Sequence, residues 1–169
     1  MDSPPVDLSF KEIFTVTDAL EEEPNKGLRP LTTNSEGKYL SRSLRLGYNK
    51  LSNLDGLQYV IDHFLADPTK LCWLDLSFNN LTSIDPVLFE LEELRVLYLH
   101  GNSISNMTEV EDLGVLKHLH TITLHGNVIE SLRDYRNQVI FALPHLKNMD
   151  FSVVTPRERE LANLWSKKV

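Results

Sequence analysis

The hydrophobic residues of this chain follow a pattern that recurs along most of its length. Four segments, residues 41–51, 71–81, 94–104 and 119–129, fit L-x-x-L-x-L-x-x-N-x-L with substitutions. Their asparagines recur at intervals of roughly 23 to 30 residues, as in stacked structural repeats. These asparagines are Asn49, Asn79, Asn102 and Asn127. Four copies in the same register predict that the chain folds as a repeat protein.

Each copy is expected to contain one short strand, because its apolar residues alternate. Leu74 and Leu76 are two positions apart, so both side chains point to the same side of an extended chain. A single turn cannot bury this apolar row, and neighbouring turns must stack to form a shared core. The asparagine that follows turns the chain out of the strand. Its amide is expected to bond to backbone groups of its own and neighbouring turns.

Together these features are the leucine-rich repeat signature. They predict an α/β solenoid of about five turns, with short parallel strands on the concave face and helices or extended turns on the convex face. Helix starts are expected at residues 55–58, at Asp85 and Pro86, and at Thr108. A further helix is expected over residues 131–142, before the next proline.

The last turn, residues 146–156, departs from the pattern. It keeps apolar residues at Leu146, Met149 and Phe151, but Val154 stands where the asparagine is expected. The loss of the asparagine is typical of a terminal turn that caps a repeat array.

A C-terminal helix is expected next, because Thr155 and Glu158 have the spacing of a capping box. Its apolar face consists of Leu161, Leu164 and Trp165. We expect this face to seal the last turn; the alternative is that it binds a partner.

The chain therefore divides into three expected parts. Residues 1–40 form an N-terminal arm or cap, residues 41–154 form the repeats with their degenerate last turn, and residues 155–169 form a C-terminal capping helix. We expect the first part to dock on the first repeat through four apolar side chains, which are Leu8, Phe10, Ile13 and Phe14. The alternative is a free arm that reaches a partner.

Composition narrows the class of protein. The 169 residues are 41% hydrophobic and 24% charged, as in one globular domain. No apolar run approaches the roughly 18 residues of a membrane-spanning helix, and the first residues lack the pattern of a secretory signal. Cys72 is the single cysteine, so no internal disulfide can form. These features favour a reducing, cytoplasmic location.

The charge also excludes some partners. A net charge of −7 argues against non-specific binding to nucleic acid or to a membrane surface. Residues 81–112 are notably acidic, and form either a solvated surface or a patch that faces a basic partner.

The sequence contains no motif for phosphate binding, acyl transfer or zinc-dependent hydrolysis. We therefore expect no enzyme activity, no cofactor, no metal and no small-molecule substrate. His100 and His125 occupy equivalent positions on neighbouring turns, about 5 Å apart. A third ligand with the spacing of a metal site is missing from the sequence.

Protein partners are expected to bind the concave face, where the residues between the core leucines project. Trp73 and Tyr98 are large aromatic residues on adjacent strands, and such side chains frequently anchor interfaces. The alternative is that they cover apolar surface beneath the N-terminal arm. The candidate partner-binding residues are Arg45, Trp73, Asp75, Tyr98, His100, Thr123 and His125. Equivalent positions of successive strands are expected to form rows on this face. The row nearest the asparagines is expected to consist of Gly47, Ser77, His100, His125 and Ser152.

The runs WLDLSFNNLTSIDPVL, VLYLHGNSI and YRNQVIFALPHLKNMDF resemble the small intracellular leucine-rich repeat family. This resemblance implies a non-catalytic protein-interaction scaffold, associated with ciliated cells as a structural component of the ciliary or flagellar axoneme. The implied partners are axonemal or microtubule-associated proteins. The alternative is a nuclear or cytosolic regulatory adaptor that binds one protein partner, for example an RNA-binding or phosphatase-type protein.

Overall fold

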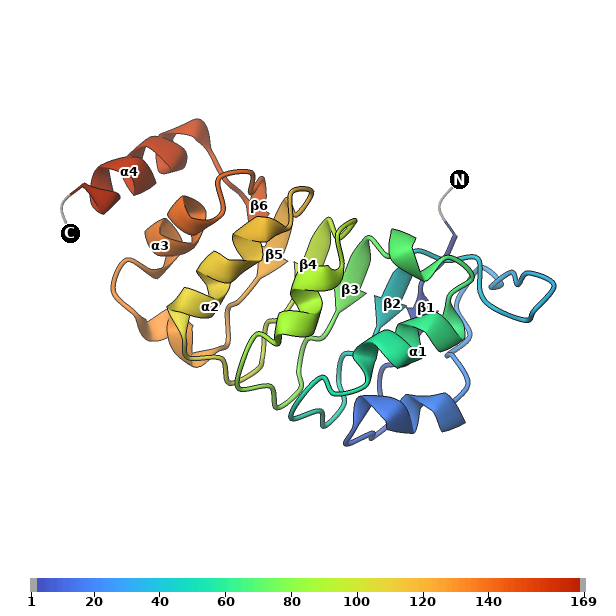
Figure 1. Ribbon diagram of the computed structural model, residues 1–169. Coiled ribbons are helices and arrows are strands. Elements are labelled where there is room, and N and C mark those ends of the chain that lie inside the picture. Colours follow the sequence, from blue (N-terminus) through green and yellow to red (C-terminus); the bar gives the residue numbers. More distant parts are fainter. Residues whose placement is uncertain (1–2, 168–169) are drawn as a thin grey trace.

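The computed structural model describes residues 3–167, and these form a solenoid built on one sheet (Figure 1). Its strands lie side by side in chain order, with every neighbouring pair parallel except the last. The strands are β1 (Val6–Asp7), β2 (Ser43–Arg45), β3 (Trp73–Asp75), β4 (Val96–Tyr98), β5 (Thr121–Thr123), β6 (Asn148–Met149) and β7 (Ser152–Val153). The predicted α/β leucine-rich repeat solenoid is confirmed.

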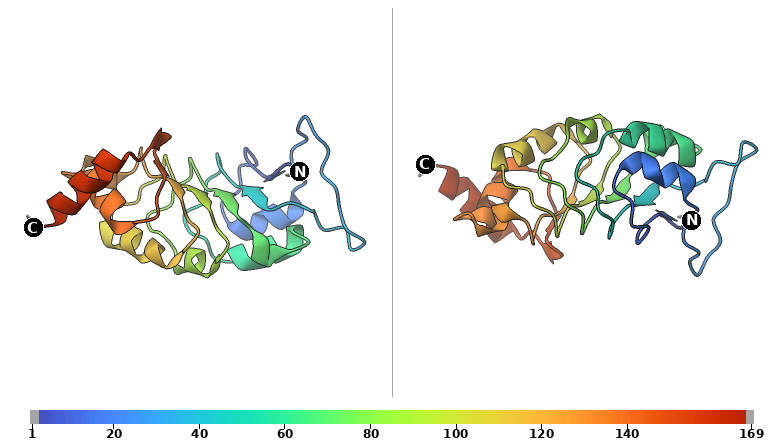
Figure 2. Two further views of the ribbon diagram at one scale, coloured as in Figure 1. Left: turned by 90° about the horizontal axis from the view of Figure 1, so that it is seen from above. Right: turned by 90° about the horizontal axis from the view of Figure 1, so that it is seen from below.

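The helices lie along the side of the molecule opposite the strands (Figure 2). The α-helices are α1 (Leu57–Phe64), α2 (Met107–Asp112), α3 (Tyr135–Ala142) and α4 (Pro156–Ser166). The 3-10 helices are η1 (Val16–Glu21), η2 (Pro68–Lys70), η3 (Pro86–Glu90), η4 (Leu113–Val115) and η5 (Val128–Ser131).

Two of the expected helix starts differ from the structure. Asn106, not Thr108, caps α2, because its side-chain oxygen accepts a hydrogen bond from the Thr108 amide at 2.9 Å. Ser131 ends the 3-10 helix η5, and α3 begins only after Asp134 turns the chain with φ 58°. The starts at α1 and η3 are where they were predicted.

The strand leucines form a continuous buried row. Leu44, Leu74 and Leu97 share one register, and each is 0% exposed. Ile122 and Met149 continue the row on β5 and β6, with the same exposure. The shared core that the pattern requires is therefore present in every turn of the sheet.

The asparagines join neighbouring turns through buried hydrogen bonds. The Asn102 amide nitrogen donates to the carbonyl oxygens of Leu76 and Leu99, each at 3.0 Å, and its oxygen accepts from the Leu81 amide at 3.0 Å. Asn79 and Asn127 make the same kind of bonds to their own turn and to the turn before. Each amide thus satisfies backbone groups that are shielded from water.

The N-terminal residues form an additional turn of the solenoid. Val6 and Asp7 pair with Leu44 and Arg45 of β2, and the sequence DLSF at residues 7–10 repeats DLSF at residues 75–78. Asp7 accepts from both the amide and the hydroxyl of Ser9, as Asp75 does from Ser77. The duplicated DLSF was the signal for this turn.

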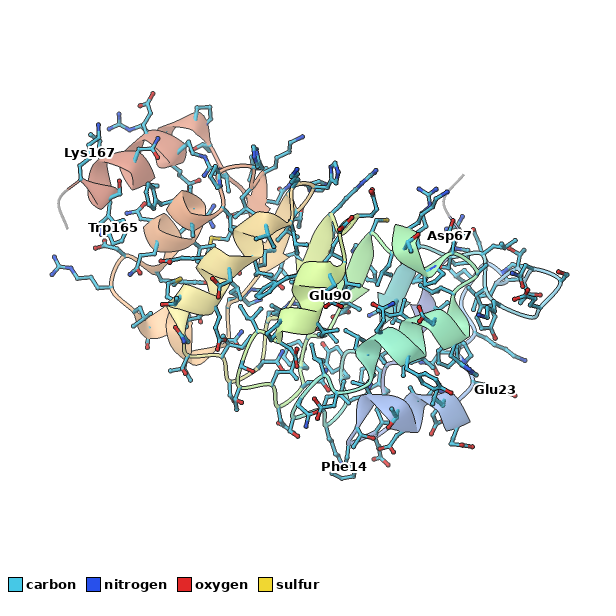
Figure 3. The ribbon with its side chains drawn as sticks, viewed as in Figure 1. Phe14, Glu23, Asp67, Glu90, Trp165 and Lys167 are labelled. Carbon is cyan, nitrogen blue, oxygen red and sulfur yellow. The ribbon has the colours of Figure 1, made fainter. Side chains whose placement is uncertain are left out.

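The segment packs on the first repeat as expected, but only two of the four predicted apolar residues are buried. Leu8 is 0% and Ile13 is 4% exposed, whereas Phe10 is 67% and Phe14 is 63% exposed. Phe14 lies at the outer edge of the molecule (Figure 3). Phe10 and Phe14 contact the first repeat without being buried: the Phe10 ring stacks on Tyr48, and Nζ of Lys50 lies 5.1 Å from the centre of the Phe14 ring.

The C-terminal end turns back on itself. Asp150 and Phe151 have φ values of 52° and 64°, and β7 then runs antiparallel to β6 with Ser152 opposite Met149. Ser152 therefore does not continue the row of Gly47, Ser77, His100 and His125, as the repeat pattern predicted.

The predicted sealing face of α4 was also wrong. Leu161 and Leu164 are 42% and 53% exposed, and Ala162 is the buried residue of this helix. The guanidinium of Arg159 donates to carbonyl oxygens at the end of α3, including that of Leu146 at 2.8 Å. The Trp165 indole nitrogen donates to Asp134 at 3.0 Å (Figure 3). Polar contacts to the ends of α3, rather than a leucine face, attach α4.

Replacing Asn102 by Leu is expected to lower the free energy of unfolding by about 3 kcal/mol, because three buried backbone groups lose their partner. Urea denaturation measures the change. Asn80→Leu is the control, since the Asn80 side chain is exposed. Equal stability of Asn102→Leu and wild type would contradict the role of the amide.

Leu8→Ala is expected to cost about 2–4 kcal/mol, as for other fully buried leucines. Phe14→Ala, in the same segment, is expected to change stability by no more than about 0.5 kcal/mol because its ring is exposed. Thermal unfolding of both variants compares them. A larger loss from Phe14→Ala than from Leu8→Ala would show that the segment does not pack as a turn of the solenoid.

Candidate functional site

The concave face carries a cluster of aromatic rings. Trp73 and Tyr98 project from adjacent strands and meet edge to face, with ring centroids 5.4 Å apart. Both are partly exposed. The structure therefore brings these two candidate residues together on the side of the sheet away from the core leucines.

His100 and His125 extend this cluster. Their rings stack at 4.8 Å with an interplanar angle of 7°. Tyr98 lies beside His100, with ring centroids 5.8 Å apart. Four of the candidate residues thus form one surface across β3, β4 and the turns that follow β4 and β5.

Phe151 completes the cluster and was missed as a site residue in the sequence analysis. Its ring centroid lies 5.3 Å from Tyr98, 5.3 Å from His100 and 5.5 Å from His125. It is 61% exposed. The positive φ values at Asp150 and Phe151 place this ring over the histidines. We call Trp73, Tyr98, His100, His125 and Phe151 the concave aromatic cluster.

Two candidate residues support this cluster from below rather than forming its surface. Asp75 is 4% exposed and Thr123 is 0% exposed. The Thr123 hydroxyl oxygen accepts hydrogen bonds from the amides of Leu99 and His100, and lies 2.7 Å from Nδ1 of His100. Thr123 therefore fixes the orientation of the His100 ring.

Arg45 is held between two carboxylates. Its guanidinium lies 3.6 Å from Asp7 and 3.5 Å from Asp75. Asp75 in turn accepts from the amide and the hydroxyl of Ser77. Arg45 and Asp75 consequently link the first three turns.

Asp150 anchors the other side of the cluster. Its carboxylate accepts from the Leu124 amide at 2.7 Å and from the Tyr135 hydroxyl at 2.7 Å, and lies 3.2 Å from Nδ1 of His125. Burial alone would raise the pKa of Asp150, but these hydrogen bonds outweigh burial and hold that pKa below its usual value. Burial and the bond to Asp150 raise the pKa of Tyr135, which stays a neutral donor.

A second set of exposed rings lies beside the asparagines. Phe10 stacks on Tyr48 at 4.4 Å, and Tyr48 stacks on Phe78 at 4.6 Å. All three have left-handed backbone conformations, with φ values of 59°, 55° and 53°, which is unusual for bulky residues. In the next turn Gly101 stands at the position equivalent to Phe78, directly before the asparagine. A Cβ at Gly101 would lie only 2.6 Å from the Phe78 ring.

Two further features are absent from the part of the chain that the structure describes. Residues 3–167 bring together no group of three His, Cys, Asp or Glu side chains that could hold a metal. Within the same residues, no helix is both long and apolar enough to span a bilayer.

Residues 43–168 match the leucine-rich repeat family, and the chain belongs to that family. It is similar to leucine-rich repeat-containing protein 51, with 47% identity to the protein of Macaca mulatta and 46% to that of Homo sapiens. Both alignments span 164 residues, 97% of this chain and 85% of the relative. The predicted membership of a leucine-rich repeat family is confirmed.

More distant similarities agree with this class. Leucine-rich repeat-containing protein 23 of Xenopus tropicalis is 31% identical over 112 residues, which are 66% of this chain and 30% of that protein. The structure also resembles a chain in the crystal structure of the Drosophila melanogaster SNF/U2A' complex, with a TM-score of 0.68 and 22% identity. That match covers 96% of this chain and 80% of the other, and shows the same fold. The chain is thus a leucine-rich repeat protein-interaction domain.

His100 is expected to make stability depend on pH. Burial, followed by the nearby His125, lowers the pKa of His100 below its usual value. A free histidine binds its proton at about pH 6.5, whereas folded His100 does so only at lower pH. The unfolded state therefore takes up more protons as the pH falls below neutral, and stability decreases.

The melting temperature of the wild type is accordingly expected to fall between about pH 7.5 and about pH 5.5. His100→Gln removes the titrating ring and is expected to reduce this fall. His120, whose pKa burial also lowers, accounts for part of the remainder. An equal fall in wild type and His100→Gln would contradict the assignment to His100.

Proposed function

We propose that this protein is a non-catalytic scaffold that binds a protein partner through the concave aromatic cluster. The observation that supports the proposal most directly is the contact of five partly or fully exposed rings across neighbouring turns. Interfaces are enriched in such aromatic residues, because rings bury large areas at little cost in side-chain entropy.

The cluster is also preorganised, which favours binding. Thr123 and Asp150 hold the two histidines by hydrogen bonds, and the Asp150 carboxylate is itself fixed by Tyr135. Side chains that are already ordered lose less freedom when a partner binds. The surface is therefore suited to a partner that places apolar groups against a fixed surface.

We further propose that the protein acts in the cytoplasm as a structural component of the ciliary or flagellar axoneme, with axonemal or microtubule-associated proteins as partners. The support is the resemblance of the sequence to small intracellular leucine-rich repeat proteins. Because the net charge is −7, attraction to an acidic filament surface by bulk charge is unfavourable. The contact must then use specific patches such as the concave aromatic cluster.

Affinity capture from ciliated cells, combined with immunolocalisation, tests this assignment. Recovery of axonemal proteins and staining along the axoneme are the expected results. Diffuse cytosolic staining without any axonemal protein would contradict the location. Recovery of one regulatory protein at equal stoichiometry would support the alternative of an adaptor with a single partner.

Replacing both Trp73 and Tyr98 by Ala is expected to weaken partner binding about a thousandfold, since each interface aromatic contributes about 2 kcal/mol or more. The fold is expected to survive, because neither ring fills the leucine core. Capture from lysate and unfolding curves measure the two effects.

The matched control replaces Tyr59 and Phe141, two aromatic residues of α1 and α3 that are 64% and 46% exposed. Their removal is expected to leave capture unchanged. Loss of the partner in the control, with retention in Trp73→Ala/Tyr98→Ala, would place the binding surface on the helices instead.

A further inference from the structure

A row of cations lies along the edge of the sheet where the strands begin. The residue just before each strand from β2 to β6 is, in order, Arg42, Cys72, Arg95, His120 and Lys147. Backbone hydrogen bonds fix this order: Cys72 donates to the Arg42 carbonyl at 2.9 Å, Arg95 to Cys72 at 2.8 Å, His120 to Arg95 at 3.0 Å and Lys147 to His120 at 2.7 Å. Neighbours in the row are therefore about 4.8 Å apart.

The three permanent cations of this row are exposed and evenly spaced. Arg42, Arg95 and Lys147 stand before β2, β4 and β6, so successive cations are two strands, or about 9.6 Å, apart. Among the described residues, none of the three forms an ion pair. Such a row is unexpected on a chain with a net charge of −7.

The cations raise the local potential. After burial, the charges of Lys147 and Arg95 are the next causes that lower the pKa of His120. His120 lies between these two residues in the row. An anionic group placed here would be attracted by both neighbours and would favour protonation of the histidine.

Four of the five residues of the row, all except Lys147, line a groove of about 760 Å³. Trp73 and Val96 supply apolar surface, and the remaining wall includes Pro5 and Leu40. The one acidic residue that lines this groove, Asp67, is paired with Lys70 at 3.3 Å. Glu92 and Glu93 line an adjoining hollow with Arg42 and Arg95, but among the described residues neither arginine forms an ion pair. Asp67 is labelled at the upper right of the molecule in Figure 3.

We propose that this basic groove binds an acidic, extended segment of a partner protein. Carboxylates of the segment bind Arg42 and Arg95 in the groove and Lys147 beyond it in the same row, and an apolar side chain packs on Trp73. The groove adds a second binding surface to the proposed scaffold. That its partner is a protein rests on the proposed function.

The spacing of the cations specifies the segment further. In a polyproline II helix, residues three positions apart lie on the same side and about 9.3 Å apart. This distance matches the interval of about 9.6 Å between successive cations. The best segment therefore carries an acidic residue at every third position. Arginine adds geometric selectivity, because its planar guanidinium can bind a carboxylate through two parallel hydrogen bonds.

Fluorescence anisotropy with purified protein tests the groove. The probe is a labelled seven-residue peptide with glutamate at every third position and proline between, and a second peptide has glutamine in place of glutamate. We expect the glutamate peptide to bind about tenfold more tightly than the glutamine peptide, with an affinity that decreases as salt is added.

Charge reversal locates the binding. Arg42→Glu/Arg95→Glu is expected to weaken glutamate-peptide binding by about tenfold or more. The control Lys117→Glu/Arg133→Glu changes the net charge equally at exposed positions outside the groove, and is expected to bind almost like wild type. Unfolding curves establish that both variants are folded.

Four results would overturn the proposal. These are no binding of the glutamate peptide, equal binding of both peptides, equal loss in the two charge-reversal variants, and tighter binding of an oligouridylate of equal length. The assay needs no cellular partner, so its outcome is separate from the capture experiment. Partner capture without peptide binding overturns the groove alone, whereas peptide binding without any captured protein contradicts the scaffold function.

Discussion

The interaction on which the rest of the structure depends is the set of bonds made by each buried asparagine. The Asn79 amide donates to carbonyl oxygens of Leu46 and Leu76, which belong to two different turns, and accepts from the Leu51 amide. A single side chain thus satisfies backbone groups of both turns where the chain leaves the strand. Without it, the turns would have to bury unpaired polar groups, at a cost of about 1–3 kcal/mol for each. This requirement fixes the spacing and the register of the solenoid.

Because the register is fixed, equivalent residues of successive turns lie side by side and form rows along the solenoid. Positions between the leucines become the concave aromatic cluster, and the position before the strand becomes the basic groove. The two surfaces meet at Trp73, which touches Tyr98 on one side and lines the groove on the other. One partner with an apolar region and an acidic extension could therefore occupy both surfaces at once.

The stacked rings beside the asparagines have an unfavourable backbone conformation, and ring packing offsets part of its cost. A left-handed conformation costs roughly 1–2 kcal/mol at a residue other than glycine, yet Tyr48 and Phe78 both adopt it. Stacking between aromatic rings recovers about 0.5–1.5 kcal/mol per pair, and the Phe78 ring covers Gly101 in the following turn. Gly101 and Gly126 occupy the same position in the next two turns.

The repeat pattern was enough to predict the solenoid, the asparagine bonds, the buried leucine row and the approach of Trp73 to Tyr98, because each of these follows from a short motif repeated in register. It did not reveal the N-terminal turn: Lys11 stands where the other turns have asparagine, and DLSF alone is a weak copy. Only the tertiary structure placed Phe151 over the histidines and left Leu161 and Leu164 exposed. The place of Phe151 depends on the reversal at Asp150 and Phe151. That reversal forms because Asp150 finds partners in Leu124 and Tyr135, which come from other turns and which no local pattern specifies.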